Sequence, residues 1–414
     1  MVSVIASNST AVNSTGASAR TAAGSSAVRD LLAQAARPGM ISLAGGLPDA
    51  ELFPTDELAE LTRELIATDG RQLLQYGKTE GADESRQALA KHFDLGDPGR
   101  VLITSGSQQG LDLLVQALAD PGEQIVVSDP EYLGMLQVLR SRGVEPVPVP
   151  TDADGLDIDS LTARLREGLR PKACYLVPHF HNPSGASISA DRRAELHRLS
   201  TKYGFVVIDD DPYRDLYRPG GRTPGGSAGI DAACDPDWTV RLRTASKSLA
   251  PGLRVAVIEA PPRLLDAMVI AKQSADLHTS SLTQAVVAKA VQAPWFPEHL
   301  NGLRQSYDRK CTVLFDALQN RFGSRISVTR PQGGMFLWAR FEQMDAARST
   351  GSAEPMDCGQ WLDRALQAGV CFVPGSAFAV AADLSDYARF SFATASAGQL
   401  EEAVDRLANS IDPA

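Results

Sequence analysis

Short apolar runs alternate with helix-like segments between residues 100 and 210, and this alternation restricts the fold more than any other feature of the chain. The runs, which are nearly free of charged residues, lie at 101–104, 125–127, 147–149, 173–177 and 205–208. Between them, apolar residues recur with the spacing of a helix. Strands that are apolar on both faces belong to sheets that helices cover on both sides. The alternation therefore predicts an α/β fold built on a mostly parallel sheet.

Two helices in this region have recognisable ends. Apolar residues at 133, 136 and 139 predict a helix that Gly143 stops. Ser189 is a suitable N-cap for a second helix, which Gly204 ends.

The pattern changes after residue 300. Helices are expected over 297–322, 358–368 and 398–410, and strands over 336–339, 371–373 and 388–392. This succession is typical of a separate, smaller α+β domain. We therefore expect a disordered N-terminal tail at 1–25, a segment at 26–47 that joins the small domain, a large domain at 48–300 and a small domain at 301–414.

The composition disfavours several classes of protein. With 414 residues the chain can form two domains, and its net charge of −10 disfavours nucleic acid as a partner. The five cysteines include no C-x-x-C pair, which disfavours a zinc site and a disulfide framework and favours a reducing compartment. No apolar run approaches the roughly 20 residues that cross a bilayer, and the first residues lack the apolar core of a signal peptide. We expect a cytoplasmic protein that binds no metal, membrane or nucleic acid.

Polar residues gather where four of the predicted strands end. The clusters lie at 105–109, 181–185, 209–213 and 244–254. In open α/β sheets, ligands bind outside the carboxyl ends of the strands. The first cluster precedes a helix, where free N–H groups favour an anion, although a serine N-cap after a glycine turn explains it equally well. The second cluster has the residues of a surface turn, which is the alternative to a binding role.

The other two clusters carry charges that need an explanation. Asp209, Asp210 and Asp211 crowd one strand end, where burial of even one carboxylate requires a cationic partner. A helix N-terminus could account for two of them, and a protonated pyridine nitrogen for the third. Lys247 lies among hydroxyl groups and Arg254, so its amine could bond to an aldehyde while its neighbours hold a phosphate. A solvated basic loop is the alternative for this segment.

Three motifs follow one another in these clusters: Asn-Pro-x-Gly at 182–185, Asp-x-x-Tyr at 210–213, and Ser-Lys at 246–247 with an arginine seven residues after the lysine. Their order resembles that of fold type I pyridoxal-phosphate aminotransferases. Further segments look like those of the 2-aminoadipate/kynurenine aminotransferase branch, and they lie at 42–48, 53–54, 74–76, 104–109, 275–279, 333–336 and 372–375. The resemblance runs from about residue 25 to the C-terminus. It implies a large domain with a mostly parallel seven-stranded sheet between helices, and a smaller α+β domain.

The resemblance also implies roles for particular residues around pyridoxal 5'-phosphate. Lys247 would bond to the cofactor aldehyde and move protons, Asp210 would pair with the ring N–H, and Tyr213 would bind the phenolic oxygen. The other residues matched to the cofactor site are Ser107, Gln108, Tyr132, Asn182, Thr244, Ser246, Arg254 and, from a neighbouring subunit, Tyr76. Those matched to the substrate site are Arg389, Asn182, Gly46 and Arg29. Because Tyr76 would serve the other subunit, the resemblance implies a homodimer with shared active sites.

The implied activity is transfer of the amino group of an L-amino acid to a 2-oxo acid, such as 2-oxoglutarate or pyruvate, by a ping-pong mechanism. A pyridoxal-phosphate enzyme of another reaction type, such as an oxidase, a hydroxylase or an elimination enzyme, is one alternative. A non-catalytic sensor, like the aminotransferase-like domain of some transcription factors, is the other.

The chain departs from the branch at three places. His179-Phe180-His181 stands where Ser-Phe-Gln is usual, Arg243 replaces a usual glycine, and Ala250 stands where serine is common. The two imidazoles could be packed core groups, or they could alter substrate preference and proton traffic. These departures leave the amino donor and the acceptor open.

Overall fold

The computed structural model of the protein describes residues 31, 34, 37–221, 234–342 and 356–411, so the predicted tail and Arg29 lie outside the described residues. Within these residues the main element is a sheet of eight strands in the spatial order β2-β9-β8-β7-β6-β3-β4-β5. The strands are β2 (Val101–Thr104), β3 (Gln124–Asp129), β4 (Glu145–Asp152), β5 (Gly155–Leu156), β6 (Ala173–Leu176), β7 (Val206–Asp210), β8 (Thr239–Thr244) and β9 (Ala256–Glu259).

Most neighbouring strands of this large sheet run parallel. β9 is antiparallel to both β2 and β8, and the two-residue β5 is antiparallel to β4. The other pairs are parallel. The family resemblance implied seven strands, and the described sheet has seven plus β5, a short hairpin partner of β4 at the edge. Since the parallel strands end at the same edge of the sheet, the loops that follow them lie close together there.

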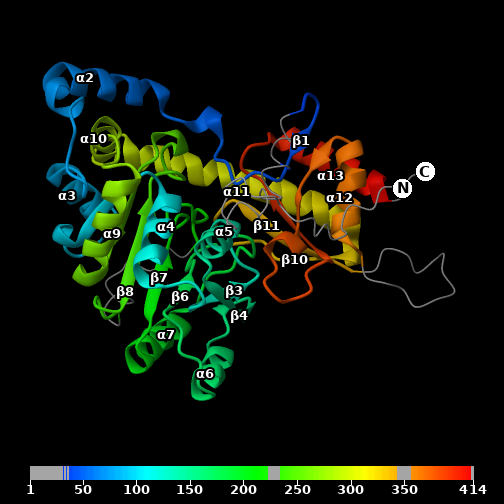
Figure 1. Ribbon diagram of the computed structural model, residues 1–414. Helices are drawn as coiled ribbons and strands as arrows, with labels where there is room; N and C mark the ends of the chain where they lie inside the picture. The colour runs from blue at the N-terminus through cyan, green and yellow to red at the C-terminus, as the bar shows by residue number, and fades with distance from the viewer. Residues whose placement is uncertain (1–30, 32–33, 35–36, 222–233, 343–355, 412–414) are drawn as a thin grey trace, which may run out of the picture.

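Helices cover both faces of the large sheet (Figure 1). Ile125 and Ile208 belong to the main apolar core, whereas Val126 and Val207 belong to a second core shared with α6 and α7. Successive residues of a strand therefore face opposite sides, as the apolar runs predicted. The helices of this part are α2 (Thr55–Leu73), α3 (Asp83–His92), α4 (Ser107–Leu118), α5 (Leu133–Arg142), α6 (Ile158–Arg166), α7 (Ala190–Tyr203), α9 (Pro262–Ala275) and α10 (Ser281–Ala290).

The helix ends predicted from capping residues are confirmed. α5 stops at Gly143, whose φ of 68° is left-handed. α7 begins after Ser189, whose side chain accepts a hydrogen bond from the backbone of Arg192, and stops at the left-handed Gly204. Within the described residues, no helix is both long and apolar enough to cross a membrane.

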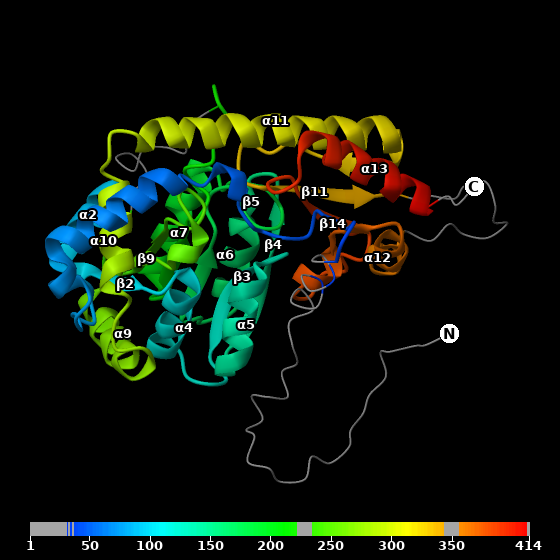
Figure 2. The same ribbon diagram turned by 90° about the horizontal axis from the view of Figure 1, so that it is seen from above.

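A smaller antiparallel sheet lies beside the large one (Figure 2). Its strands, in spatial order, are β10 (Ile326–Val328), β11 (Phe336–Phe341), β14 (Tyr387–Ser391) and β13 (Val373–Pro374). The accompanying helices are α12 (Cys358–Gln367) and α13 (Ala397–Ile411). The helices and strands expected here agree with these elements to within two residues, with one exception.

The single strand expected at 371–373 is wrong, because the structure has two short strands there. β12 (Val370–Cys371) pairs in parallel with β1 (Ile41–Ser42), whereas β13 pairs with β14. The N-terminal segment takes the first pairing, a contact between distant parts of the sequence that a local apolar pattern does not reveal. Phe372, between the two strands, is fully buried.

One long helix, α11 (Phe296–Phe322), runs past both sheets (Figure 2). At its start, Phe296 packs edge-on against the ring of His92 in α3. At its end, Phe322 packs against Phe341 and Trp361 of the smaller sheet region. The domain boundaries expected at residues 47 and 300 stay a prediction, and α11 crosses the second of them.

Candidate active site

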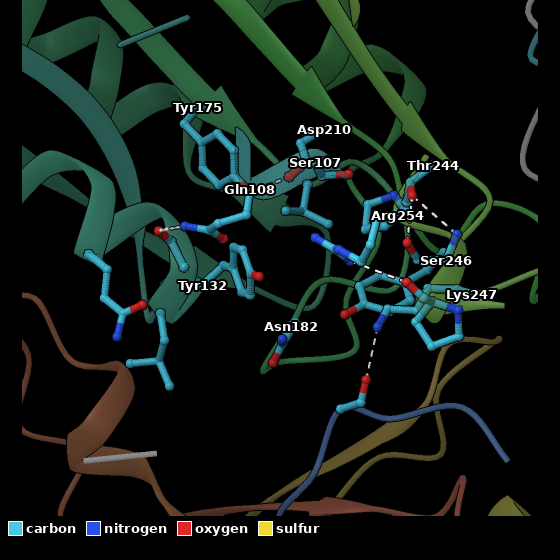
Figure 3. Close-up of a pocket in the computed structure, with 18 of the residues that line it drawn as sticks. Ser107, Gln108, Tyr132, Tyr175, Asn182, Asp210, Thr244, Ser246, Lys247 and Arg254 are labelled. Carbon is cyan, nitrogen blue, oxygen red and sulfur yellow. Dashed lines mark hydrogen bonds between the residues drawn. The ribbon is translucent and has the colours of Figure 1, made fainter. Parts of the chain in front are cut away.

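A cavity of about 320 Å³ opens at the carboxyl ends of the parallel strands (Figure 3). Its wall combines loops of the large sheet with a residue of β14 and one from the segment before α2. The predicted site residues that line it are Gly46, Ser107, Gln108, Tyr132, Asn182, Asp210, Tyr213, Thr244, Ser246, Lys247, Arg254 and Arg389. Residues far apart in the sequence thus meet at the sheet edge that the strand pattern indicated.

Lys247 lies in the turn after β8 and lines the cavity with its side chain. Its Nζ donates a hydrogen bond to the carbonyl oxygen of Gly46 at 2.9 Å. Burial, together with the positive charges of Arg254 and Arg389, lowers the pKa of the amine from 10.5 to about 8. An amine with this pKa is partly uncharged near neutral pH, so it can serve as a nucleophile and a base.

Asp210 is the last residue of β7 and faces the same cavity. Its Oδ2 accepts a hydrogen bond from the hydroxyl of Tyr175 at 2.8 Å. Its Oδ1 is buried and has no hydrogen-bond partner among the described residues. Burial raises the pKa of Asp210 from 3.8 to about 7, against the opposing effects of Tyr175 and Arg243. One carboxylate oxygen is therefore free to bind an N–H group or a cation.

The two flanking aspartates have partners within the protein. Asp209 accepts hydrogen bonds from Arg193 at 2.5 Å and from Arg243 at 2.9 Å. Asp211 lies 2.8 Å from Nδ1 of His179. The hypothesis that two of the acids stand at a helix N-terminus is wrong, because no helix directly follows β7 in the described residues. Two arginine side chains compensate the charge of Asp209, and His179 is the partner of Asp211.

The second imidazole, His181, is also a packed group. Its Nε2 lies 3.3 Å from Oε1 of Glu131, and its Nδ1 lies 2.9 Å from Oγ of Ser184. The described part of the cavity wall includes neither His179 nor His181. These contacts favour the first alternative from the sequence, in which the imidazoles are core groups that tie neighbouring loops together.

Hydroxyl groups and Arg254 form one end of the cavity. Ser107 is the first residue of α4, and its Oγ is buried without a hydrogen-bond partner among the described residues. Gly106, with a φ of 84°, lets Arg254 approach, since a Cβ there would lie 2.3 Å from Nη2. Thr244 Oγ1 donates to Ser246 Oγ at 2.9 Å. A helix N-terminus, hydroxyls and a guanidinium together are suited to a phosphate.

Aromatic and amide side chains form other parts of the cavity wall. Tyr132 precedes α5, and burial raises the pKa of its phenol to about 12. Gln108 donates to the carbonyl of Gly134 at 2.9 Å. Tyr213 packs edge-on against Phe336, with ring centroids 5.9 Å apart. Both phenols therefore keep their protons at neutral pH, because burial also raises the pKa of Tyr213.

Arg389 projects from β14 of the smaller sheet and closes another part of the cavity. Its Nη1 donates to Oδ1 of Asn182 at 2.7 Å, and its Nη2 donates to the carbonyl of Ala44. The guanidinium lies over the rings of Phe336 and Phe378, at 4.3 and 4.9 Å from their centroids. Burial lowers its pKa to about 10, so the group stays charged at neutral pH.

Among the described residues, one predicted site residue, Tyr76, does not line this cavity. Tyr76 is 79% exposed, and its ring packs against His278 at 6.0 Å. Arg29 lies outside the described residues. A role for either therefore stays a prediction.

Sequence reasoning missed Tyr175, which lines the cavity and holds Asp210. The available signal was a tyrosine in an otherwise apolar strand. Its neighbours Cys174 and Leu176 face α6 and α7, so Tyr175 faces the opposite side of the sheet. Leu133, Gln137 and Val177 also line the cavity without having been predicted.

The cavity fits pyridoxal phosphate. A protonated ring nitrogen would give the unpartnered Oδ1 of Asp210 its partner, and a phosphate would do the same for Oγ of Ser107 beside Arg254. An aldehyde would find the amine of Lys247. The first two matches rest on buried polar atoms that have no hydrogen-bond partner among the described residues.

Known proteins resemble this chain over nearly its whole length. Residues 38–407 match the family model described as aminotransferase class I and II. A 2-aminoadipate transaminase of Thermus thermophilus is 37% identical over 93% of this chain and 94% of its own length. An aromatic-amino-acid aminotransferase of Thermococcus litoralis is 34% identical over 93% of this chain and 91% of its own length. The crystal structure of an alpha-aminoadipate aminotransferase from Thermus thermophilus, complexed with N-(5'-phosphopyridoxyl)-L-leucine, has a TM-score of 0.84 at 34% identity and covers 94% of this chain and 95% of its own.

The fold and the cavity define a fold type I pyridoxal-phosphate enzyme. The chain belongs to the class I and II aminotransferases and lies near the 2-aminoadipate and kynurenine aminotransferases, as its motifs predicted. It is therefore an enzyme that uses pyridoxal phosphate to transfer an amino group between an amino acid and a 2-oxo acid. The relatives named above do not support another reaction type or a non-catalytic sensor.

Proposed function

We propose that Lys247, Asp210 and Arg389 form the reacting centre of this aminotransferase, with pyridoxal phosphate between them. One observation carries the proposal: an amine of lowered pKa, a carboxylate oxygen without a partner among the described residues and a buried guanidinium line the same cavity. Perturbed, incompletely paired charges in one buried space are typical of a functional site.

Lys247 is the proton carrier in this proposal. When bound, pyridoxal phosphate supplies an aldehyde that takes up the amino group and a ring that accepts the electron pair left on Cα. Nζ of Lys247 removes the Cα proton and later returns it, which requires the uncharged amine. Its pKa of about 8 leaves a useful fraction of that form near neutral pH. A 2-oxo acid then takes the amino group in a second half-reaction, so the order is ping-pong.

Asp210 would hold the proton of the ring nitrogen through Oδ1, while Tyr175 fixes Oδ2. Tyr213 and Asn182 would bind the phenolic oxygen of the ring, for which the protonated Tyr213 supplies a donor. The remaining residues would hold the phosphate or lie against the ring: Ser107, Gln108, Tyr132, Thr244, Ser246 and Arg254.

Arg389 binds the carboxylate that every donor and acceptor of this enzyme carries. The contacts with Asn182, Ala44 and two aromatic rings hold the guanidinium in place. Its Nε has no hydrogen-bond partner among the described residues, which leaves a donor for a carboxylate oxygen. We propose 2-oxoglutarate or pyruvate as the acceptor, because both present this group beside the 2-oxo carbon. Gly46 lines the cavity on the side of the substrate.

A homodimer with shared active sites is the proposed assembly. Tyr76 is 79% exposed, and Leu74 and Leu277, which lie close to it in the chain or beside its partner His278, are 70% and 44% exposed. An exposed aromatic residue among exposed apolar residues supports a surface that a second subunit covers. Tyr76 would then reach the phosphate of that subunit.

The Lys247→Ala variant tests the centre. The purified enzyme is mixed with single amino acids under anaerobic conditions, without an oxo acid, and its absorbance is recorded. We expect the wild type to lose its visible band stoichiometrically and gain a near-ultraviolet band. The Lys247→Ala variant should bind the cofactor without covalent attachment and show no turnover.

The matched control is Lys202→Ala, an exposed lysine at the end of α7. It should behave as the wild type does. Wild-type turnover in Lys247→Ala, or borohydride labelling of a different lysine, would overturn the assignment. Catalytic turnover that requires oxygen would instead contradict transamination as the main reaction.

Mixed dimers test the role of Tyr76. A Tyr76→Ala subunit and a Lys247→Ala subunit are each expected to be weakly active or inactive on their own. Their heterodimer should regain activity, because one of its two sites would combine an intact Lys247 with an intact Tyr76 from the other chain. If mixing restores nothing, Tyr76 does not act across subunits.

A further inference from the structure

A fully buried lysine, Lys272, lies in the last turn of α9, outside the cavity described above. Its side chain is 0% exposed. Its Nζ donates to both carboxylate oxygens of Asp276 at 2.8 and 2.9 Å, to Oε1 of Gln109 at 2.9 Å and to Oγ1 of Thr279 at 3.1 Å. A buried ammonium persists only where such acceptors surround it. The described cavity wall includes none of these four side chains.

Two acceptors of Lys272, Gln109 and Asp276, also hold Ser105, which lies two residues before Ser107 of the cavity wall. The backbone N–H of Ser105 donates to Oε1 of Gln109 at 2.7 Å, and its hydroxyl donates to Oδ2 of Asp276 at 3.0 Å. The carbonyl of Ser105 accepts from Nη2 of Arg254 at 3.2 Å. Every polar group of Ser105 is therefore fixed, directly before Gly106 and Ser107.

The same cluster continues to the segment that carries Tyr76. Asp276 accepts a backbone hydrogen bond from His278 through its carbonyl at 2.7 Å. Nε2 of His278 accepts from the backbone N–H of Gly77 at 3.2 Å, and the ring of His278 packs against Tyr76. An unbroken series of contacts thus connects Arg254 at one end with Tyr76 at the other.

The charges of the cluster matter for an anion nearby. Gln109 Nε2 donates to Oδ2 of Asp276 at 2.7 Å, so this carboxylate lies beside the loop of the phosphate end. Burial opposes its ionisation, but the bonds from Lys272, Gln109 and Ser105 hold the pKa of Asp276 below its usual range. Its negative charge would repel a phosphate if the ammonium of Lys272 did not neutralise it.

We propose that Lys272, Asp276 and Gln109 are positioning residues for the phosphate of the cofactor. Lys272 neutralises Asp276, and the three side chains together hold the loop 105–107 in the shape in which Ser107 and Arg254 receive a phosphate. The inference rests on the proposed function, since it takes the Ser107–Arg254 end of the cavity as the phosphate site.

The test compares two ligands that differ only in the phosphate, pyridoxamine phosphate and pyridoxamine, by calorimetric titration of the cofactor-free protein. Lys272→Met should lower the affinity for pyridoxamine phosphate on the order of tenfold, which is about 1.4 kcal/mol of binding free energy. The cause would be the uncompensated charge of Asp276 and the loss of a contact that holds the loop 105–107. Its affinity for pyridoxamine should stay within about twofold. A merely structural role of Lys272 would weaken both ligands alike.

Asp276→Asn provides a variant with the opposite expectation, because an amide of the same shape replaces the carboxylate. It removes the negative charge and keeps Lys272, so the affinity for pyridoxamine phosphate should be unchanged or higher. Lys202→Met is the control for loss of a lysine distant from the cavity. If Lys272→Met fails to fold, Gln109→Leu takes its place, with the same selective loss expected.

Equal losses for the two ligands, or no loss of pyridoxamine phosphate affinity in Lys272→Met and Gln109→Leu, would overturn the inference while the proposed function stands. A different result separates the two proposals. If the wild-type protein binds pyridoxamine as tightly as pyridoxamine phosphate, the proposed phosphate site itself is wrong, whatever the variants do.

Discussion

Strand β7 ends in two neighbouring aspartates whose surroundings differ completely. Asp209 points toward the face covered by α7, where Arg193 and Arg243 supply its hydrogen bonds. Although burial opposes ionisation, these guanidinium groups hold the pKa of Asp209 well below its usual range. Asp210 points into the cavity, where burial raises its pKa to about 7 and Oδ1 has no partner among the described residues.

The difference separates charges that serve the fold from charges that serve a ligand. On the α7 face, the chain supplies the partners that a buried carboxylate needs, so the cluster is complete without a cofactor. On the cavity face, Tyr175 holds one oxygen of Asp210, and the described residues leave the other open to a cation. Substitutions on the first face should therefore affect folding, and substitutions on the second should affect chemistry.

Asp209→Asn should give the largest effect, on stability. It leaves two buried guanidinium groups without the carboxylate that they share, which costs roughly 3–5 kcal/mol for a broken buried pair. Chemical denaturation of the cofactor-loaded enzyme measures this loss. The fraction that remains folded should turn over within a few-fold of the wild type. If stability were unchanged and turnover collapsed, the two faces would not differ in the way described.

Asp210→Asn should show the reverse pattern. Loss of the carboxylate that holds the ring proton should lower kcat about 10²- to 10³-fold, the range for removal of one preorganised electrostatic group. The stability of the cofactor-free protein should not fall, because a buried carboxylate with an unpaired oxygen is replaced by a neutral amide of the same shape. Steady-state kinetics of the loaded enzyme and denaturation of the cofactor-free protein decide the matter. Normal turnover would refute the role of Asp210.

The pH dependence of the cofactor-free protein isolates the same residue. A carboxyl whose pKa rises from 3.8 to about 7 on folding stabilises the folded state below about pH 4, and this contribution is lost as the pH rises through about 7. As the pH rises from about 4 to about 7, the free energy of unfolding of the wild type should thus fall relative to that of Asp210→Asn, by at most about 4 kcal/mol. Denaturation curves of both proteins across this range give the difference. A difference that does not change with pH would mean that Asp210 is not perturbed.

Tyr175→Phe should have the smallest effect. It removes one hydrogen bond to Asp210, worth about 1.5–3 kcal/mol when the acceptor is charged. We expect a lower kcat with a KM that hardly changes, and a shift in the absorbance of the bound cofactor. Loss of stability without these changes would assign Tyr175 to the fold, with Asp209, rather than to the cavity.

The sequence predicts the position of a residue well where that position depends only on its immediate neighbours in the chain. Lys247 and Asn182 follow strand-like runs in turn motifs, so their place at the sheet edge could be predicted, and Asp210 could be assigned by resemblance. The caps of α5 and α7 were equally local, since one serine and two glycines mark them. Parallel strands bring such ends together without further information.

Contacts between residues that are far apart in the sequence could not be predicted. The residues around Asp209 in the sequence do not indicate that Arg243 is its partner, since Arg243 was notable only as a replacement for glycine. In the same way, the residues around Asp211 do not indicate that His179 is its partner. The alternative that a helix N-terminus accounts for two of the acids is therefore wrong, because no helix directly follows β7 in the described residues. The pairing of β1 with β12, which splits the strand expected at 371–373, has the same origin. Register between distant segments depends on the packed fold and leaves no trace in a local pattern.

Helix α11 gives the enzyme a mechanical property. Its 27 residues form a rod of about 40 Å, anchored by aromatic contacts with α3 at one end and with the Arg389-bearing sheet region at the other. A tilt of roughly 5° about either anchor displaces the opposite tip by about 3.5 Å. If the smaller sheet moves when Arg389 binds a carboxylate, α11 would transmit that movement to α3, at the edge of the large sheet.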